Sequence, residues 1–269
     1  MPELPEVEVS KLGISLHLTN KIITDLIVRT PKLRWDIPTG QLKLLIGQKI
    51  NAISRRAKYL VIETDRGDII IHLGMSGSLR VIDSEVELKK HDHFDLVVGD
   101  KVLRLNDPRR FGALLFAEPG QQHSVFAKLG PEPLTDDFTA EHLVAMCLKR
   151  KAVIKQVIMD NPVVVGVGNI YANEALFLAQ IDPRTPANQV SVAQLTELVS
   201  VIKIVLEAAI KQGGTTLKDF SQTDGKPGYF AQSLNVYGRG GLACLHCQTI
   251  LEQVKIGQRA TVYCPKCQK

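Results

Sequence analysis

The alternation of apolar and polar residues predicts that the first half of the chain is built from short β-strands. β-Branched runs separated by turn residues indicate strands at 21–28, 59–63, 69–72, 95–98, 101–105 and 113–116. The Gly99-Asp100 pair and the segment 65–68 are typical of turns between antiparallel strands. A helix is expected from Glu3 to about Leu18, because Pro5 is tolerated in a first helical turn. We therefore predict an antiparallel sandwich or flattened barrel that follows one helix.

After the Gly-Pro-Glu-Pro sequence at 130–133, helical periodicity replaces the strand pattern. Helices are expected at 139–150, 152–159 and 169–179, and Ser191 with Gln194 forms a capping box that opens a long helix ending at Gly213-Gly214. The small-residue segment 160–169 suits either a phosphate-binding turn or a plain turn between helices. The polar segment 213–230 suits either a mobile functional loop or a linker. The middle of the chain is thus predicted to be a helical domain.

Composition places the chain among soluble globular proteins of two or three domains. It has 269 residues, of which 45% are hydrophobic, so it can bury a substantial core. We find neither a secretory leader nor an apolar run of about 18 residues, and we therefore expect a cytoplasmic protein that makes no use of a membrane. The net charge is +5, and residues 226–269 carry all of this excess, with six Lys or Arg against one acid. A basic C-terminal region suggests a polyanionic partner.

Four of the five cysteines form a strong metal-binding pattern near the C-terminus. They occur as two Cys-x-x-Cys pairs, Cys244 with Cys247 and Cys264 with Cys267, separated by sixteen residues. This spacing is typical of a structural zinc site with four thiolate ligands, which leaves no open position for a catalytic water. The intervening residues are predicted to form a hairpin from 249–254 and 259–263, with Arg259 just past its tip. His246 is interpreted as a bystander, and Cys147 as a small core residue.

The N-terminus offers an unusual candidate nucleophile. Removal of Met1 would leave Pro2 with a free secondary amine beside the Glu3 carboxylate, and an α-amino group has a pKa near ~8, so part of it is neutral at pH 7. A proline amine forms an iminium with no N–H to lose, which can withdraw electrons from a bound aldehyde-like carbon, with Glu3 within reach as a proton donor. Taken alone, these residues are more often a plain N-terminus, and other motifs must decide.

Six motifs together, in this order, resemble those of bacterial formamidopyrimidine-DNA glycosylases. They are the opening Met1–Glu8, the run Arg55–Tyr59, His72–Gly77, Asp107–Gly112, Gly166–Tyr171 and the terminal zinc site. The resemblance spans almost the whole chain. It implies an α+β multidomain fold with a leading helix and β-sandwich at 1–132, a helix-two-turn-helix domain at 133–228 whose 213–230 loop covers the lesion, and a zinc finger hairpin at 229–269.

The resemblance also implies an activity and a set of site residues. The family excises oxidised purines, chiefly 8-oxoguanine and formamidopyrimidines, from duplex DNA and then cleaves the strand by β- and δ-elimination. Pro2 would be the nucleophile and Glu3 would handle protons at the sugar, while Lys58 matches a β-strand lysine of the β-elimination step and Arg259 a phosphate-binding arginine of the δ-elimination step. The DNA-contacting positions would be His91, Arg109, Arg150, Lys155 and Asn169, with Met75 and Phe111 joining Arg109 to fill the space left by a flipped base.

The implied partners are damaged double-stranded DNA and one zinc ion, with no organic cofactor, for a bacterial monomer associated with the nucleoid. Two other functions remain open at this point. An endonuclease VIII-like glycosylase for oxidised pyrimidines shares the amine nucleophile, although its opening usually has Gly where this chain has Leu4. A non-catalytic zinc-ribbon protein that binds DNA would make Pro2 incidental. A zinc-thiolate redox switch is a third hypothesis.

Overall fold

The computed structural model describes residues 2–215 and 233–269, which form two compact units. The first unit contains residues 2–127 and 212–215, and the second contains residues 128–211 and 233–269. The boundary near residue 128 lies where the strand pattern of the sequence ends. No helix in these described ranges is long and apolar enough to cross a membrane.

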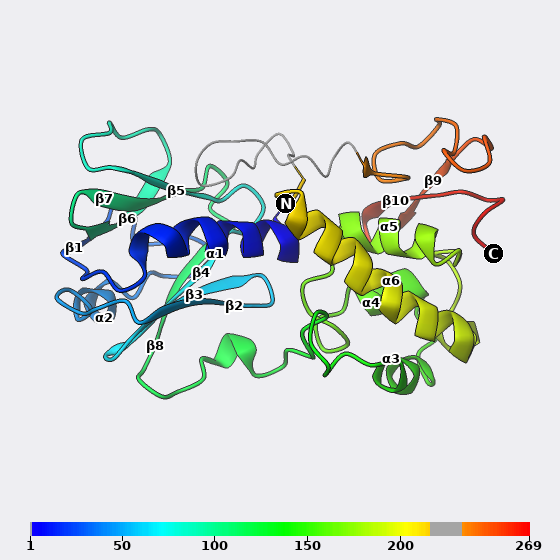
Figure 1. The fold of residues 1–269 in the computed structure, drawn as a ribbon, viewed down its shortest axis with the longest axis horizontal. Helices are drawn as coiled ribbons and strands as arrows, with labels where there is room; N and C mark the ends of the chain where they lie inside the picture. The colour runs from blue at the N-terminus through cyan, green and yellow to red at the C-terminus, as the bar shows by residue number, and fades with distance from the viewer. Residues whose placement is uncertain (1, 216–232) are drawn as a thin grey trace. The chain divides into compact units, whose positions relative to one another are not determined.

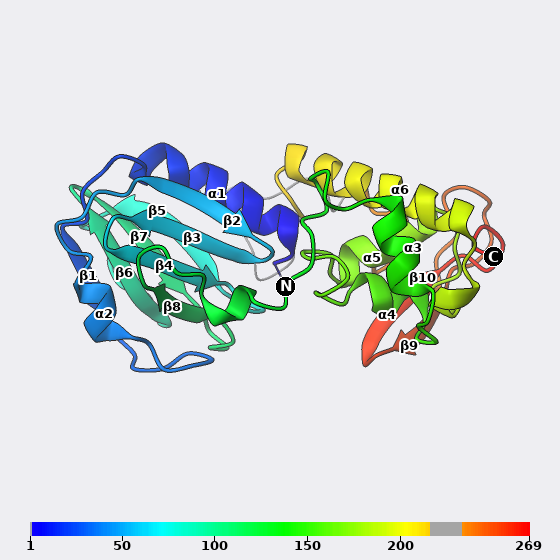
Figure 2. The same cartoon turned by 90° about the horizontal axis from the view of Figure 1, so that it is seen from below.

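The first unit is a sandwich of two four-stranded antiparallel sheets with one long helix beside it (Figures 1 and 2). Helix α1 (Leu4–Leu18) packs against β2. One sheet has the order β1-β6-β7-β5 and the other β2-β3-β4-β8. The strands are β1 (Asp25–Val28), β2 (Ala52–Arg56), β3 (Tyr59–Thr64), β4 (Gly67–His72), β5 (Ser78–Asp83), β6 (Asp92–Val98), β7 (Lys101–Asn106) and β8 (Ala113–Ala117), with a short helix α2 (Thr39–Lys43) and a 3₁₀ turn η1 (Ser124–Phe126).

The core of this unit lies between the two sheets, where alternate residues of each strand are buried. Leu60 and Ile62 of β3 and Ile69 and Ile71 of β4 belong to the same apolar cluster as Phe94 and the other inward residues of the facing sheet. Because side chains alternate across a strand, one face of each sheet supplies this core. On the other face of the β2-β3-β4-β8 sheet, Val61, Ile70 and Leu115 belong to a second, smaller apolar cluster. The predicted sandwich and its leading helix are confirmed.

The strands that the sequence did not predict lie at sheet edges. β2 and β5 each form an edge of a sheet, and each has a single buried position, Ile53 in β2 and Leu79 in β5. Edge strands contact the core on less of their surface, so a polar sequence is tolerated there and hydrophobic periodicity is weak. β1 is also shorter than predicted, since it begins at Asp25 rather than residue 21.

The second unit combines four α-helices with a C-terminal β-hairpin (Figure 2). Helix α6 begins with the predicted capping box, in which Gln194 N donates to Ser191 Oγ at 3.2 Å and Ser191 N donates to Gln194 Oε1 at 3.1 Å. The chain then turns at Gly213 and Gly214, both with positive φ. The elements are α3 (Ala140–Cys147), α4 (Ile154–Ile158), α5 (Asn169–Leu178), η2 (Ala187–Gln189), α6 (Val192–Lys211), β9 (Glu252–Ile256) and β10 (Arg259–Tyr263).

Helix α4 is shorter than the sequence suggested because a tertiary contact replaces its expected first turn. Val153 forms a β-bridge with Pro186, and Ile154 N donates to the Thr185 carbonyl at 2.8 Å. Val153 is therefore extended and α4 begins at Ile154. At the other end of the unit, β9 and β10 pair in the predicted hairpin, whose two-residue turn Gly257-Gln258 has positive φ at both positions, as a type I′ turn requires.

Candidate functional site

The N-terminal residues are fixed by a capping box at the start of α1. Pro2 is buried, and Glu3, which is 1% exposed, is the N-cap residue. Glu3 N donates to Glu6 Oε2 at 2.8 Å, and the Glu3 side chain in turn accepts from the Glu6 backbone N–H. The second Glu6 oxygen accepts from both N and Oγ1 of Thr215, at 3.0 and 2.9 Å. The buried Glu6 carboxylate thus holds the proposed nucleophile's segment against the chain that follows α6.

Lys58 lies in the two-residue turn between β2 and β3. Arg56 and Tyr59 form the last pair of the ladder, so Ala57 and Lys58 are the turn residues. Ala57 has a φ of 55°, a left-handed conformation that alanine adopts rarely. The description of Lys58 as a strand residue is therefore wrong in detail, because the side chain projects from a hairpin tip that belongs to the same sheet.

His72 stands beside the Lys58 turn and is held neutral. It pairs with Tyr59 across β3 and β4, and the two rings are 4.7 Å apart. Burial, together with the nearby Lys58 ammonium and Arg34 guanidinium, lowers the pKa of His72 from its ordinary 6.5 to about 4, although the Asp107 carboxylate opposes this shift. Gly74 N donates to His72 Nδ1 at 3.0 Å. A neutral ring that accepts at Nδ1 carries its proton on Nε2, so this bond fixes the tautomer.

The three residues expected to fill the space of a flipped base come from two adjacent loops of the first unit. Met75 is 37% and Phe111 46% exposed, and the Arg109 guanidinium lies 4.9 Å from the centre of the Phe111 ring. The loops touch closely, since a Cβ on Gly74 would lie 2.4 Å from the Phe111 carbonyl carbon. Exposed apolar side chains of this size on a rigid base suit insertion between stacked groups.

A buried carboxylate, Asp107, joins these two loops. Asp107 Oδ1 accepts from Ser76 Oγ at 2.8 Å and from Arg109 N at 3.3 Å, and Oδ2 accepts from Gly112 N at 2.8 Å. Its side chain is completely buried. Asp107 N donates to the carbonyl of His91, a residue with a φ of 74°, so the predicted His91 contact position lies beside the same loops.

Two further predicted residues of the second unit, Lys155 and Asn169, bind the zinc hairpin. Lys155 is only 1% exposed. Its ammonium donates to Asn169 Oδ1 (2.8 Å), Thr261 Oγ1 (2.7 Å) and the Ala260 carbonyl (3.2 Å). Asn169 Nδ2 donates to the same carbonyl at 3.1 Å. These bonds connect α4, the start of α5 and β10, and they fix the strand that begins with Arg259.

Three of the predicted cationic residues line one cavity. Arg150, Lys155 and Arg259 surround a space of about 410 Å³ between α4 and the hairpin tip. Asp160 is also in the lining and forms an ion pair with Arg150 at 2.8 Å. The hairpin turn approaches α4 closely, since a Cβ on Gly257 would lie 2.9 Å from the Gln156 side chain. A partly exposed cavity with this excess of positive charge suits a phosphate group.

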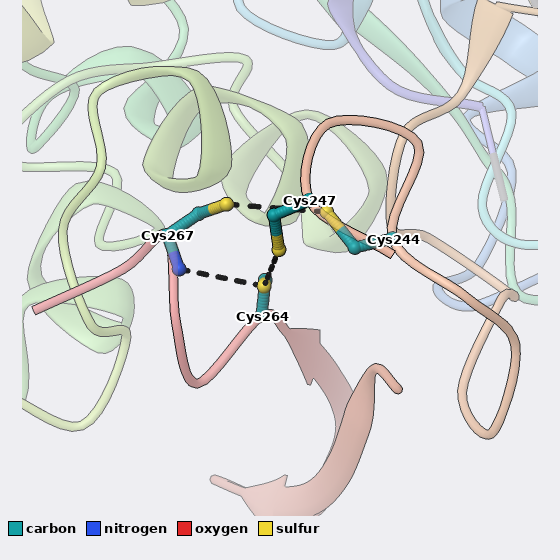
Figure 3. A group of neighbouring side chains, drawn as sticks. All are labelled: Cys244, Cys247, Cys264 and Cys267. Carbon is teal, nitrogen blue, oxygen red and sulfur yellow. Dashed lines mark hydrogen bonds between the residues drawn. The ribbon is translucent and has the colours of Figure 1, made fainter. Parts of the chain in front are cut away.

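The four cysteines of the second unit form a metal site (Figure 3). Their sulfur atoms all lie within 4.8 Å of one another, with Cys247 Sγ 3.4 Å from Cys264 Sγ and Cys244 Sγ 4.0 Å from Cys267 Sγ. Zinc bound tetrahedrally by sulfur at about 2.3 Å places its ligands about 3.8 Å apart, so the cluster fits this ion. Cys267 N donates to Cys264 Sγ, a bond typical of the shell around a metal thiolate.

The remaining sequence candidates near this site have structural roles. His246 packs its ring against Phe177 of α5, with centres 4.8 Å apart, and the metal cluster found among the described residues contains the four cysteines alone. Cys147 is buried in α3, and burial raises the pKa of its thiol to about 11, which suppresses the reactive thiolate. Both interpretations from the sequence agree with the structure.

Comparison with known sequences identifies the family from three consecutive regions. Residues 1–114 match the formamidopyrimidine-DNA glycosylase N-terminal domain, residues 129–221 the formamidopyrimidine-DNA glycosylase H2TH domain, and residues 241–269 the zinc finger found in FPG and IleRS. The chain belongs to the formamidopyrimidine-DNA glycosylase family. The four clustered thiolates of this family member hold one structural zinc ion.

Family members from three bacterial genera are similar over almost their full length. The formamidopyrimidine-DNA glycosylase of Aliivibrio fischeri is 60% identical over 100% of this chain and 98% of its own length. That of Vibrio atlanticus is also 60% identical, over 100% of both chains, and that of Shewanella halifaxensis is 57% identical over 100% of both.

Solved structures of the family share the fold. The Lactococcus lactis enzyme in complex with DNA containing an abasic site has a TM-score of 0.92 and 33% identity over 99% of both chains. A MutM complex with DNA containing carbocyclic 8-oxo-G has a TM-score of 0.92 and 33% identity over 100% of both chains.

The sequence did not reveal three buried carboxylates that position the backbone around the candidate site residues. Glu6 and Asp107 are buried carboxylates that position backbone segments, and both lie inside the recognised motifs. Glu174 of α5 does the same in the second unit, where it accepts from the backbone of 235–237. The signal available was weak: Glu6 follows Glu3 at the spacing of a capping box, whereas the partners of Asp107 and Glu174 are distant in sequence.

Proposed function

We propose that this chain is a bifunctional DNA glycosylase and abasic-site lyase of base excision repair, which excises oxidised purines, chiefly 8-oxoguanine and formamidopyrimidines, from duplex DNA. The observation that carries the proposal is the buried Pro2-Glu3 pair, held at the start of α1 by Glu6 in a chain of this family. A fixed N-terminal amine is a suitable covalent catalyst for attack on a sugar carbon, because its position is set before the substrate arrives.

The proposed reaction begins after removal of Met1. The Pro2 nitrogen uses its lone pair to form a bond to C1′ of the damaged nucleotide, and the bond from C1′ to the base breaks, with its electron pair leaving on the base. The nitrogen then gives up its N–H proton, which neutralises the departing base. Its lone pair forms a C=N bond as the C1′–O4′ bond breaks, Glu3 supplies a proton to O4′, and the nitrogen becomes a cationic iminium. The iminium acidifies the neighbouring C2′ position, so a proton and then the 3′ phosphate leave in β-elimination.

Lys58 and Arg259 are proposed to serve the two elimination steps. Lys58 lies in a turn that Arg55 ties to α1 through Glu8, which suits a phosphate contact and proton transfer near the sugar. Arg259 begins β10 at the cavity that Arg150 and Lys155 also line, and a guanidinium binds a phosphate leaving group without giving up a proton. We propose that Lys58 acts in the β-elimination step and Arg259 in the δ-elimination step at an extruded nucleotide.

The DNA-binding residues are also proposed to have separate roles. Phe111 enters the stack, Met75 fills the vacated space and Arg109 donates to the unpaired partner base, while His91, Asn169, Arg150 and Lys155 hold the backbone. The buried position of Lys155 means that it would act on the backbone chiefly through Asn169 and the hairpin that it holds. The loop 213–230 is proposed to cover the flipped base, and most of it lies outside the described residues.

The proposed domain division is 1–132 for catalysis, 133–228 for DNA binding and 229–269 for the zinc finger. The partner is damaged double-stranded DNA, bound by a monomer associated with the bacterial nucleoid, and a structural zinc ion completes the protein. Basic charge concentrated in residues 226–269 supports the assignment of a polyanionic partner.

Borohydride trapping tests the covalent step directly. The protein is incubated with a duplex that contains one 8-oxoguanine, sodium borohydride is added, and the adduct is digested and located by mass spectrometry. We expect a reduced linkage at Pro2 and an intact mass without Met1, because an acylated proline nitrogen has no lone pair available for attack. The undamaged duplex is the control. Full retention of Met1 in protein that cleaves the lesion strand would rule out this nucleophile.

A further inference from the structure

The guanidinium of Arg55 connects α1 to the turn that carries Lys58. Arg55 Nε donates to Glu8 Oε2 at 2.7 Å, and Arg55 Nη1 donates to the Ala57 carbonyl at 2.9 Å. The Arg55 side chain is 10% exposed and the Glu8 side chain 16% exposed, so both groups of the ion pair are shielded from solvent. These two hydrogen bonds leave from different nitrogens of one planar group, which fixes its orientation.

The bond to Ala57 acts on the backbone of Lys58. The carbonyl of Ala57 and the nitrogen of Lys58 belong to the same planar peptide unit, so anchoring the carbonyl sets the orientation of that plane. Ala57 also has a φ of 55° and is 2% exposed. A left-handed alanine is unfavourable by roughly 1 kcal/mol or more, and it persists where the surroundings hold it. Arg55 therefore supports a strained turn directly before Lys58.

The bond to Glu8 connects the turn to the helix of the proposed nucleophile. Glu8 lies in α1, whose N-cap is Glu3. Although burial raises the pKa of Glu8, hydrogen bonds from Lys11 and Arg55 outweigh it and hold that pKa below its usual value, so the carboxylate remains ionised at neutral pH. One guanidinium therefore connects the helix that presents Pro2 to the turn that presents Lys58.

We propose that Arg55 is a positioning residue that places the Lys58 ammonium for strand cleavage, by holding the Ala57 carbonyl with one nitrogen and Glu8 with another. The inference rests on the proposed function of Lys58. Arginine suits this place because its planar fork reaches two acceptors at once, whereas a lysine has a single ammonium on a flexible chain and cannot hold both in the same geometry.

A double-mutant cycle tests this proposal. Arg55→Lys, Lys58→Ala and the double variant are compared in single-turnover cleavage of a duplex that carries one abasic site. With Lys58 present, we expect Arg55→Lys to lower the maximal cleavage rate about tenfold, with less than about a twofold change in the KM. With Lys58→Ala as the background, we expect less than about a twofold further loss, because the group being positioned is gone.

The matched control is Arg29→Lys, which alters an arginine of the same unit whose ion pair with Asp95 lies in the other sheet. It should cleave at the wild-type rate. Equal losses from Arg55→Lys with and without Lys58 would overturn the proposal, since they would show a general structural effect. Wild-type cleavage by Arg55→Lys or by Lys58→Ala would overturn it as well.

A second variant keeps the proposal testable if Arg55→Lys destabilises the fold. If Arg55→Lys melts far below Arg29→Lys, Glu8→Gln is used instead, since it keeps an oxygen acceptor but removes the charge. It should lower cleavage about threefold when Lys58 is present and leave the Lys58→Ala rate unchanged; equal losses in both would contradict the inference. Borohydride trapping of the wild-type protein separates this result from failure of the proposed function, because a wild type without an adduct refutes both.

Discussion

The two units hold their functional side chains by different means. In the sandwich, Pro2, Lys58, Met75 and Arg109 stand on elements packed over a large apolar core, and buried polar groups only adjust their positions. In the zinc hairpin, the apolar cluster has six buried residues, two of them metal ligands, so burial alone supplies little stability. The difference indicates that the position of the proposed nucleophile depends on packing, whereas the position of Arg259 depends on the zinc ion and on bonds to neighbouring helices.

Of the changes considered, loss of the metal should have the largest effect, and it should affect the hairpin but not the sandwich. Cys264→Ser removes one of four thiolates, and structural zinc contributes on the order of 10 kcal/mol to folding of such modules. We expect zinc content to fall from about one ion per chain to nearly none, DNA affinity to drop by more than about tenfold, and the hairpin to become sensitive to trypsin while the sandwich survives. Zinc analysis and limited proteolysis measure this.

The matched control for that experiment is Cys147→Ala, which removes the remaining cysteine, in the same unit but outside the metal site. It should keep full zinc content. A Cys264→Ser protein with stoichiometric zinc and a resistant hairpin would contradict the dependence of this region on the metal.

Replacing Lys155 tests the second support of the hairpin. Lys155→Met keeps the apolar stem but removes the donor to Asn169, Ala260 and Thr261, leaving acceptors without their bond in a buried place. We expect a loss of about 3 kcal/mol in the free energy of unfolding, with zinc content unchanged. Urea unfolding followed by zinc analysis gives both values. A stability change below about 0.5 kcal/mol would show that Lys155 does not hold β10.

A pH titration of the unfolding free energy tests the buried, neutral state of His72 in the sandwich. The folded pKa of His72, about 4, lies below the ordinary value of 6.5. The unfolded chain therefore takes up a proton that the folded chain refuses, and stability should fall by about 3 kcal/mol as the pH drops from 7 through 4, then level off for this group. His72→Asn keeps an acceptor for Gly74 N but cannot titrate. Its unfolding free energy should lack this part of the pH dependence, and identical curves would refute the assignment.

The smallest effect is expected at His246. His246→Ala removes a ring that packs on Phe177 and leaves the four thiolates in place. Zinc content should remain at about one ion per chain, and stability should fall by about 1 kcal/mol, measured by thermal unfolding. Partial loss of zinc would mean that the histidine takes part in binding the metal.

Much of the site was predictable because motifs carry it in short stretches of sequence. The spacing of Cys244 and Cys247 predicts a metal-binding turn, and the capping box of Ser191 and Gln194 predicts the start of a helix. The edge strand β2 and the turn position of Lys58 were not predictable, since Arg55 and Arg56 read as polar and only pairing with β3 makes them a strand.

The sequence by itself determined the family, the sandwich, the helical domain, the metal ligands and the candidate nucleophile, because local periodicity and fixed spacings encode them. Tertiary structure alone decided how those groups are held. Arg55 reaches Glu8 across 47 positions, Lys155 reaches Thr261 across 106, and Thr215 reaches Glu6 across 209. Hydrogen bonds between residues so far apart form only after the hydrophobic core has brought the chain together, so no local pattern records them.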